Sequence, residues 1–405
     1  MKKNIILITL IFLIFFACGR KTQFPAQPKT PKVQTKNEPI NTEIDTILQV
    51  GAEQLDLYLP DLQGKRVGMV VNHTSLVGKT HLVDTLLKYQ IQLKKIFAPE
   101  HGFRGEADAG EKIINSTDPK TGIPLVSLYG KNKKPSAEQL ADIEVVIFDM
   151  QDVGTRFFTY ISTMHYVMEA AAENDKKVII LDRPNPNGHL IDGSMLVPKF
   201  KSFVGMHNIP LLHGLTIAEL ANMINGEGWL AGGMKCKLKT VPNKNYKHHK
   251  SYILPVRPSP NLPNQQAVLL YPSVCLLEGT VLSVGRGTDF PFQVIGGNNP
   301  VYGSFTFTPK SAFGARKPLL ENQTCFGIDL RNESTNGFTL KYLIDFYQKS
   351  PDKANFFNSY FDTLVGTDVL KKQIIAGMTE EQIRQTWQTD LEKYKTLRKK
   401  YLLYE

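Results

Sequence analysis

The chain has 405 residues, 42% hydrophobic and 21% charged, which is an ordinary composition for a globular protein but more chain than one hydrophobic core usually fills. We therefore expect two lobes. The formal net charge is +10, but five of the cations lie between residues 20 and 36, and no basic stripe is interleaved with stacking aromatic residues, so nucleic-acid binding is not predicted.

The first residues predict an export signal. Two lysines precede an apolar stretch from Ile5 to Ala17, which is too short for a membrane-spanning helix, and Cys18 follows it. A cysteine after a small residue at this point resembles a lipoprotein processing site, so we expect residues 1–17 to be removed and Cys18 to carry a lipid anchor. The alternative is ordinary signal cleavage or a retained anchor. Arg20 and Lys21 favour the periplasmic face.

Residues 18–47 are predicted to be a flexible tether. They are rich in Pro, Lys, Gln and Thr and poor in large apolar side chains, so they cannot bury enough surface to fold. The three cysteines that remain after Cys18 are widely spaced, which predicts buried thiols instead of a disulfide framework or a zinc site; they are Cys236, Cys275 and Cys325.

Apolar runs of strand length alternate with helical patterns in the next part of the chain. Predicted helices at 81–90 and 161–174 separate predicted strands at 66–72, 94–100, 124–130, 145–151 and 177–184. Continuous apolar strands between helices indicate an α/β lobe whose parallel sheet is covered on both faces. We assign this lobe to residues 48–195.

The regular alternation of strand and helix patterns ends in residues 196–405, which we assign to a second, smaller lobe. A helix at 216–228 and a strand at 234–241 are followed by a proline-punctuated loop, a helix and a glycine-rich turn. After Thr339 the pattern is mostly helical, and a capping box from Thr379 to Gln382 opens an amphipathic helix.

Polar residues follow the predicted strands directly. In a parallel sheet the binding crevice lies outside the carboxyl ends of the strands, so these side chains should converge on one rim, and we count Asn72 among the substrate-binding candidates. The pairs are Asn72 with His73, Glu100 with His101, Asp149 with Asp152, and Asp182 with Arg183. No glycine-rich phosphate-binding loop follows the first strand, so no nucleotide cofactor is predicted.

Glu100 is the best candidate for a general acid or base. In FAPEHGFRGEADAGE, residues 97–111, it follows Pro99 at a strand exit, where partial burial of a carboxyl group helps it to hold a proton near neutrality. His101 can orient that carboxyl group or bind substrate. The alternatives are a glutamate that caps the next turn and a packed histidine.

Asp149 and Asp152, in FDMQDVGTRFFTY, offer a second carboxylate on the same rim. Glycosidases pair two carboxyl groups at roughly 5 Å for retention or 6.5 to 9.5 Å for inversion of configuration, so either aspartate fits that chemistry in kind. The alternative is that Asp149 accepts hydrogen bonds from backbone amides at the next helix start.

Aromatic and basic residues accompany these acids. Phe157, Phe158 and Tyr160 form the kind of surface on which a sugar ring stacks, although core packing explains the phenylalanines equally well. Four arginines suit a substrate that bears a carboxylate, and we expect structural ion pairing for at least one of them; they are Arg104, Arg156, Arg183 and Arg286.

A metal site is a competing interpretation, because several potential ligands are expected on the rim: His73, His101, Asp149, Asp152 and Asp182. No paired-histidine or glutamate-histidine spacing supports this interpretation. A serine nucleophile has no supporting motif either.

Five runs, in this order, resemble the NamZ-type exo-β-N-acetylmuramidases: APEHGFRGEADAGE, FDMQDVGTRFFTY, LDRPNPNG, RPSPNLP and CLLEGTVLSVGRGTDFPFQVIG. The similarity extends from about residue 48 to the C-terminal YLLY. It implies a Rossmann-like parallel-sheet lobe joined to a smaller mixed α+β C-terminal lobe, with the active site in the cleft between them. It also implies removal of N-acetylmuramic acid from the non-reducing end of peptidoglycan-derived glycans, without metal or organic cofactor.

The resemblance implies that Glu100 is the catalytic glutamate. It also implies a set of site-lining positions, namely His101, Arg104, Asp149, Asp152, Arg156, Tyr160, Asp182, Arg183, Asn185, Arg286, Thr288 and Asp289. Glu100 is expected to protonate the leaving oxygen while Asp149 or Asp152 serves the other half-reaction. Attack by the 2-acetamido oxygen of the substrate, with an aspartate polarising the amide, stays open.

The expected function is cell-wall turnover or recycling by an exported, membrane-anchored hydrolase. Two alternatives come from other classes: a muropeptide-binding lipoprotein that does not cut its ligand, and a metal-dependent cell-wall amidase. Nothing in the sequence identifies protein partners, the oligomeric state or the tolerance of peptide stems.

Overall fold

The computed structural model describes residues 47–405 except 101, 104–115 and 336, and residues 47–405 form one compact unit. The export signal, the lipidated Cys18 and nearly all of the tether lie outside the described residues and stay predictions. No helix in the described ranges is long and apolar enough to cross a membrane.

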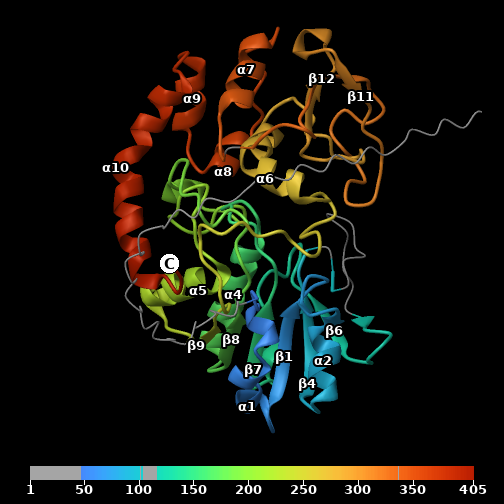
Figure 1. Ribbon diagram of the computed structural model, residues 1–405, viewed down its shortest axis with the longest axis vertical. Coiled ribbons are helices and arrows are strands. Elements are labelled where there is room, and N and C mark those ends of the chain that lie inside the picture. The colour runs from blue at the N-terminus through green and yellow to red at the C-terminus, as the bar shows by residue number, and fades with distance from the viewer. Residues whose placement is uncertain (1–46, 101, 104–115, 336) are drawn as a thin grey trace, which may run out of the picture. The chain divides into compact units, whose positions relative to one another are not determined.

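A seven-stranded sheet forms the centre of the first lobe (Figure 1). Its strands stand in the order β5-β6-β4-β1-β7-β8-β9, and all neighbours are parallel except β5 with β6. Without the short β5, this is the order of a doubly wound Rossmann sheet, which confirms the predicted fold class. The strands are β1 (Arg66–Val71), β4 (Gln92–Ala98), β5 (Ser116–Thr117), β6 (Pro124–Ser127), β7 (Val145–Asp149), β8 (Lys177–Leu181) and β9 (Lys237–Val241).

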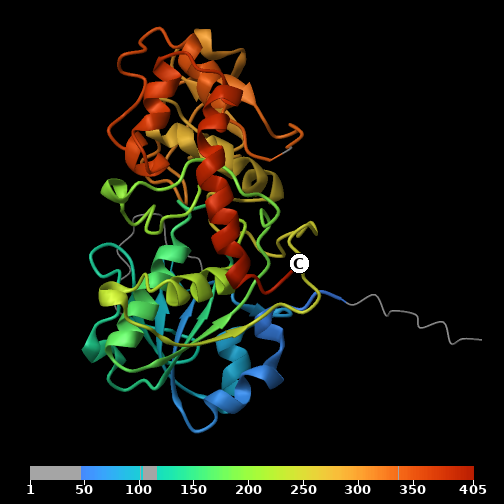
Figure 2. The same ribbon diagram turned by 90° about the vertical axis from the view of Figure 1, so that its left-hand side faces the viewer.

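The strands are apolar on both faces because helices cover both faces. Alternate residues of a strand point to opposite sides, so Val146 and Phe148 of β7 join one hydrophobic cluster, while Val145 and Ile147 join another. In Figure 2 the blue helices lie on one side of the sheet and the green helix on the other. The helices of this lobe are α1 (Leu59–Leu62), α2 (Leu82–Lys88), α3 (Ala137–Leu140), α4 (Tyr160–Glu173) and α5 (Ile217–Gly226), and a small hairpin joins β2 (Leu76–Val77) to β3 (Thr80–His81).

The register of the sheet aligns the strand ends that matter for the site. Val70 of β1 stands opposite Phe97 of β4 and Phe148 of β7. The residues that follow these strands, among them Asn72 and Glu100, therefore leave the sheet at the same edge.

The C-terminal lobe is smaller and mixed, as predicted. Its separate antiparallel sheet has the order β10-β12-β11 and lies near the top of Figure 1 beside the orange and red helices. The elements are α6 (Gln265–Val274), β10 (Val294–Gly297), β11 (Phe305–Phe307), β12 (Cys325–Asp329), α7 (Lys341–Lys349), α8 (Phe361–Val365), α9 (Val369–Ile375) and α10 (Glu380–Arg398).

The predicted capping box is confirmed at the start of α10. The Thr379 hydroxyl accepts from the Gln382 amide at 3.3 Å, and the Gln382 side chain accepts from the Thr379 amide at 2.9 Å. The prediction of buried thiols is confirmed too, because Cys236, Cys275 and Cys325 are free and buried.

The chain passes between the two lobes more than once. The strand β9 lies beyond the boundary predicted near residue 195, yet it completes the main sheet beside β8. From the other direction, α10 returns from the C-terminal lobe to the first, where Tyr394 donates to the His213 carbonyl at 2.7 Å (Figures 1 and 2). One hydrophobic cluster includes residues of both lobes.

Candidate active site

A pocket of about 380 Å³ lies at the carboxyl ends of β4, β6 and β7, against α6, α8 and the 3-10 helix η5 (Cys275–Gly279). Both lobes therefore contribute to it. Its described lining residues are Glu100, Tyr129, Phe157, Phe158, Thr159, Tyr160, Val204, Ser259, Tyr271, Cys275, Glu278, Arg286, Tyr360 and Leu364.

Glu100 reaches the pocket because β4 ends at Ala98 and Pro99 turns the chain out of the sheet. The side chain is half-buried, and Thr159 donates its hydroxyl proton to the Glu100 Oε2 at 3.3 Å. A partly exposed carboxyl group in a pocket is the position that a general acid requires. His101 and Arg104 lie outside the described residues, so their predicted roles stay predictions.

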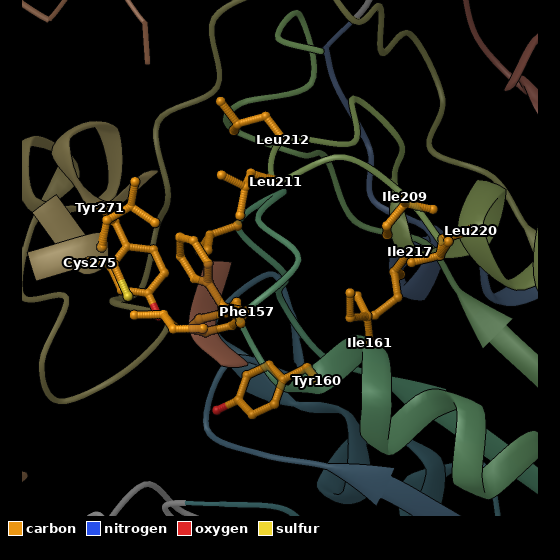
Figure 3. Packing of buried hydrophobic residues seen from close by; sticks show 14 of the residues in the cluster. Phe157, Tyr160, Ile161, Ile209, Leu211, Leu212, Ile217, Leu220, Tyr271 and Cys275 are labelled. Atoms are coloured by element: carbon orange, nitrogen blue, oxygen red, sulfur yellow. The ribbon is translucent and has the colours of Figure 1, made fainter. Parts of the chain in front are cut away.

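Aromatic rings form one wall of the pocket. The rings of Phe157 and Tyr271 meet edge to face at 5.2 Å between centroids (Figure 3). The rings of Phe158 and Tyr160 meet in the same way at 4.8 Å. Both phenylalanines are buried, so they also belong to the core. Burial raises the pKa of Tyr160, whose hydroxyl donates to the Pro258 carbonyl at 3.4 Å. The wall is apolar and held in place by packing, as a sugar-binding surface requires.

Glu278 and Arg286 form an ion pair on the C-terminal side of the pocket. Arg286 donates from Nε to Oε1 and from Nη2 to Oε2 of Glu278, the second at 3.3 Å. The guanidinium carbon also lies 4.9 Å from the centre of the Phe292 ring. The sequence analysis proposed Arg286 but missed Glu278. The signal that could have found Glu278 is a lone acid in the otherwise apolar run CLLEG.

Thr288 and Asp289 follow Arg286 but do not line the pocket. The Thr288 hydroxyl donates to the Gly285 carbonyl at 2.6 Å, which stabilises the glycine-rich turn, and Asp289 is exposed. Their predicted contact with substrate therefore has no support in the pocket geometry and stays a prediction.

Asp149 is tied to Arg183 by two hydrogen bonds, one of them from Nη2 at 2.9 Å. Asp149 is fully buried, and Arg183 also donates to the Leu76 carbonyl at 3.0 Å. Neither residue lines the pocket. The structural ion pairing that we expected for at least one arginine is confirmed here, because this pair joins the end of β7 to the end of β8.

Asp152 and Arg156 are also buried away from the pocket. The Arg156 Nη1 donates to the carbonyls of Ser194 and Ile209 at 2.8 and 2.7 Å, and burial lowers its pKa to about 9. The Asp152 Oδ2 accepts from the Gly154 amide at 2.7 Å, and burial raises the pKa of this carboxyl group to about 7. Both side chains organise loops, and their predicted substrate contacts stay untested.

Three further candidates are buried and hydrogen-bonded within the fold. Asp182 accepts from the Ala218 amide at 2.9 Å and from the Tyr404 hydroxyl, and burial raises its pKa to about 7. Asn185 donates to the Leu215 carbonyl at 2.9 Å, and Asn72 accepts from the Thr74 amide at 2.9 Å. None of the three lines the pocket. The rim predicted from strand ends therefore exists, but most of its polar groups face inward.

No group of three or more His, Cys, Asp or Glu side chains in the described part of the chain is arranged to hold a metal ion. Of the ligands considered from sequence, His73 makes a hydrogen bond of 2.7 Å with the Arg257 carbonyl, and Asp149 is bound by Arg183. The described geometry therefore offers no support for a metal centre.

Comparison with known proteins gives consistent matches over nearly the whole chain. The family model for the N-terminal part of exo-beta-N-acetylmuramidase NamZ matches residues 67–266, and the model for its C-terminal part matches residues 269–404. The peptidoglycan beta-N-acetylmuramidase NamZ of Bacillus subtilis (strain 168) is 37% identical over 417 residues, which cover 95% of this chain and 96% of that protein.

Two solved structures from Bacteroides fragilis NCTC 9343, both of DUF1343 family proteins, are similar to this chain. One has a TM-score of 0.83 and 45% identity, covering 89% of this chain and 99% of that one. The other has a TM-score of 0.78 and 30% identity, covering 88% and 99%.

Proposed function

The chain belongs to the NamZ family of exo-β-N-acetylmuramidases, and we propose that it releases N-acetylmuramic acid from the non-reducing ends of peptidoglycan fragments. It is a glycosidase acting on peptidoglycan-derived glycans. The alternatives of a non-catalytic binding lipoprotein and a metal-dependent amidase have no support in these comparisons.

The observation that carries this proposal is the position of Glu100. Glu100 is half-buried in a pocket that both lobes line and that the aromatic wall borders. In that position Glu100 donates its proton to the glycosidic oxygen as the bond to the anomeric carbon breaks. The oxygen then leaves as the hydroxyl group of the released glycan.

Arg286 is the predicted arginine best placed to meet the lactyl carboxylate of the sugar. Of the four candidates, Arg156 binds backbone carbonyls, Arg183 binds Asp149, and Arg104 lies outside the described residues. Arg286 lines the pocket, and Glu278 occupies only two of the five N–H donors of its guanidinium group. The remaining donors are available for a carboxylate.

The location of the enzyme is part of the proposal. An apolar stretch that ends at Cys18 favours export, lipidation and attachment to a membrane, with residues 18–47 as the tether and the enzyme on the periplasmic face. Replacing Cys18 with Ala in the full chain should abolish incorporation of labelled fatty acid and release the protein from the membrane fraction. Equal labelling of both proteins would exclude Cys18 as the lipidation site.

The function is tested with the chain from residue 44 onward, because residues 47–405 form one compact unit. The protein and its Glu100→Gln variant are incubated with a MurNAc-GlcNAc disaccharide. We expect free MurNAc from the unsubstituted protein alone. Binding without cleavage by both proteins would support the binding lipoprotein, and equal cleavage would remove Glu100 from the chemistry. Release of peptide from a stem-bearing muropeptide, abolished by a chelator, would support the amidase.

A further inference from the structure

We propose that Glu278 is the second catalytic carboxylate of the pocket, an inference that rests on the proposed glycosidase function. Among the described residues that line the pocket, two carry carboxyl groups, Glu100 and Glu278. Asp149 and Asp152, the partners expected from sequence, do not line it. The pocket therefore pairs a carboxyl group from the sheet lobe with one from the C-terminal lobe.

The position of Glu278 is fixed from several sides. Its carbonyl oxygen accepts from the Asn358 side chain at 3.1 Å, and its carboxylate is held by Arg286 at two points. The Phe292 ring supports the guanidinium group in turn. A two-point arginine contact fixes the plane of a carboxylate as well as its position, so Glu278 is preorganised before a substrate arrives.

The two carboxyl groups have different surroundings. The carboxylate of Glu278 is ion-paired with the Arg286 guanidinium, whereas the hydrogen-bond partner of Glu100 in the described ranges is the neutral hydroxyl of Thr159. Tyr360 lines the same pocket as Glu278 and Glu100. Acid and counter-charge roles in glycosidases are divided by such a difference in environment.

The reaction follows from this division. Glu100 gives its proton to the leaving oxygen, the bond from that oxygen to the anomeric carbon breaks, and the electron pair stays with the oxygen. Positive charge then develops on the sugar ring or, if the 2-acetamido oxygen attacks, on that group. Glu278 keeps its negative charge and stabilises this positive charge. Water finally adds to the anomeric carbon, and the proton that water loses returns to Glu100.

The test compares Glu278→Gln and Glu100→Gln on two substrates: the disaccharide, and a nitrophenyl muramide whose leaving group needs no proton. Without Glu100, we expect kcat to fall at least 100-fold on the disaccharide and much less on the nitrophenyl substrate. Without the charge of Glu278, we expect kcat to fall at least 100-fold on both. Glu333→Gln, which removes an exposed carboxylate from the same lobe, is the matched control.

The alternative is that Glu278 only positions Arg286. In that case Glu278→Gln would raise KM and change kcat less than tenfold, and the inference would be overturned. If the unsubstituted protein cuts neither substrate, the proposed function fails and this inference fails with it. If Glu278→Gln does not fold, Glu278→Asp keeps the charge but withdraws it by one methylene group; we expect at least a tenfold loss of kcat, and full activity would overturn the proposal.

Discussion

Two sets of ionisable residues meet at the carboxyl edge of the same sheet and differ in what surrounds them. Glu100, Glu278 and Arg286 line an open pocket and are partly exposed. Asp149 and Arg183, like the nearby Asp152 and Asp182, are buried. Asp149 and Arg183 bind each other, and the other partners of this second set are backbone groups and the side chains of Asn243 and Tyr404.

The difference shows that a polar residue directly after a strand can be recognised in the sequence, but that its position does not tell whether the side chain is buried or exposed. The end of β8 is covered by returning segments, which bring the Ala218 amide and the side chains of Asn243 and Tyr404 to Asp182. Buried polar groups need such partners, because an unpaired one costs free energy of folding. In the described part of the chain, Glu100 beyond the end of β4 is half-buried and lines the pocket, so its carboxyl group can reach a ligand.

The largest expected effect separates the two sets by function. Glu100→Gln should lower kcat on the disaccharide by about 10² to 10⁴, because general acid catalysis contributes that much, and should leave the unfolding temperature nearly unchanged. Kinetics and thermal unfolding of the same preparation measure both quantities. A large loss of stability without loss of kcat would give Glu100 a structural role like that of the buried residues, and would contradict the division into two sets.

The second expected effect concerns stability. Arg183→Met leaves the Asp149 carboxylate buried without its partner, and breaking a buried ion pair in this way costs about 3 to 5 kcal/mol of unfolding free energy. Urea unfolding of the purified variant measures it. The double replacement Asp149→Leu with Arg183→Met should recover much of that loss, because no buried charge remains. A single variant as stable as the unsubstituted protein would contradict the structural role.

The third effect is a dependence of stability on pH. Burial raises the pKa of Asp152 from its ordinary value of 3.8 to about 7. Between about pH 4 and pH 7 the unfolded chain loses this proton before the folded chain does, so the contribution of Asp152 to stability falls as the pH rises. The stability of the unsubstituted protein relative to Asp152→Asn should therefore drop by about 1 to 4 kcal/mol across this range and level off above it.

Urea unfolding at several pH values measures this difference. Asp182, whose pKa burial also raises to about 7, should leave the Asp152→Asn variant with a slope of the same sign. A difference between the two proteins that does not change with pH would show that Asp152 is charged in the folded state throughout.

The smallest expected effect concerns the helix cap of α10, which belongs to neither set of ionisable residues. Thr379→Ala removes the hydroxyl that caps α10 and should cost about 1 kcal/mol of unfolding free energy, with kcat unchanged. Thr379→Ser keeps the hydroxyl and serves as the control. Thermal unfolding of both variants checks the prediction, and equal stabilities would mean that the cap contributes nothing.

The sequence predicted the sheet lobe well, because buried parallel strands leave continuous apolar runs that can be recognised one at a time. Its prediction that Glu100 belongs to the site agrees with the pocket, since Pro99 directs the chain out of a strand. Glu278 was missed because it follows an apolar helix, and nothing local indicates that the packing of two lobes brings it to the pocket. The place of β9 in the sheet was missed because a long segment, which contains α5, separates it from β8.

The contact between Tyr404 and Asp182 spans 222 residues of the chain. The amide of Leu403 adds a bond of 2.9 Å to the buried Glu219, so two carboxyl groups of the sheet lobe depend on the same distant segment. During synthesis from the N-terminus, most of the sheet is made long before that segment exists. The sheet lobe therefore cannot complete the hydrogen bonds of Asp182 and Glu219 until the C-terminal segment has been synthesised.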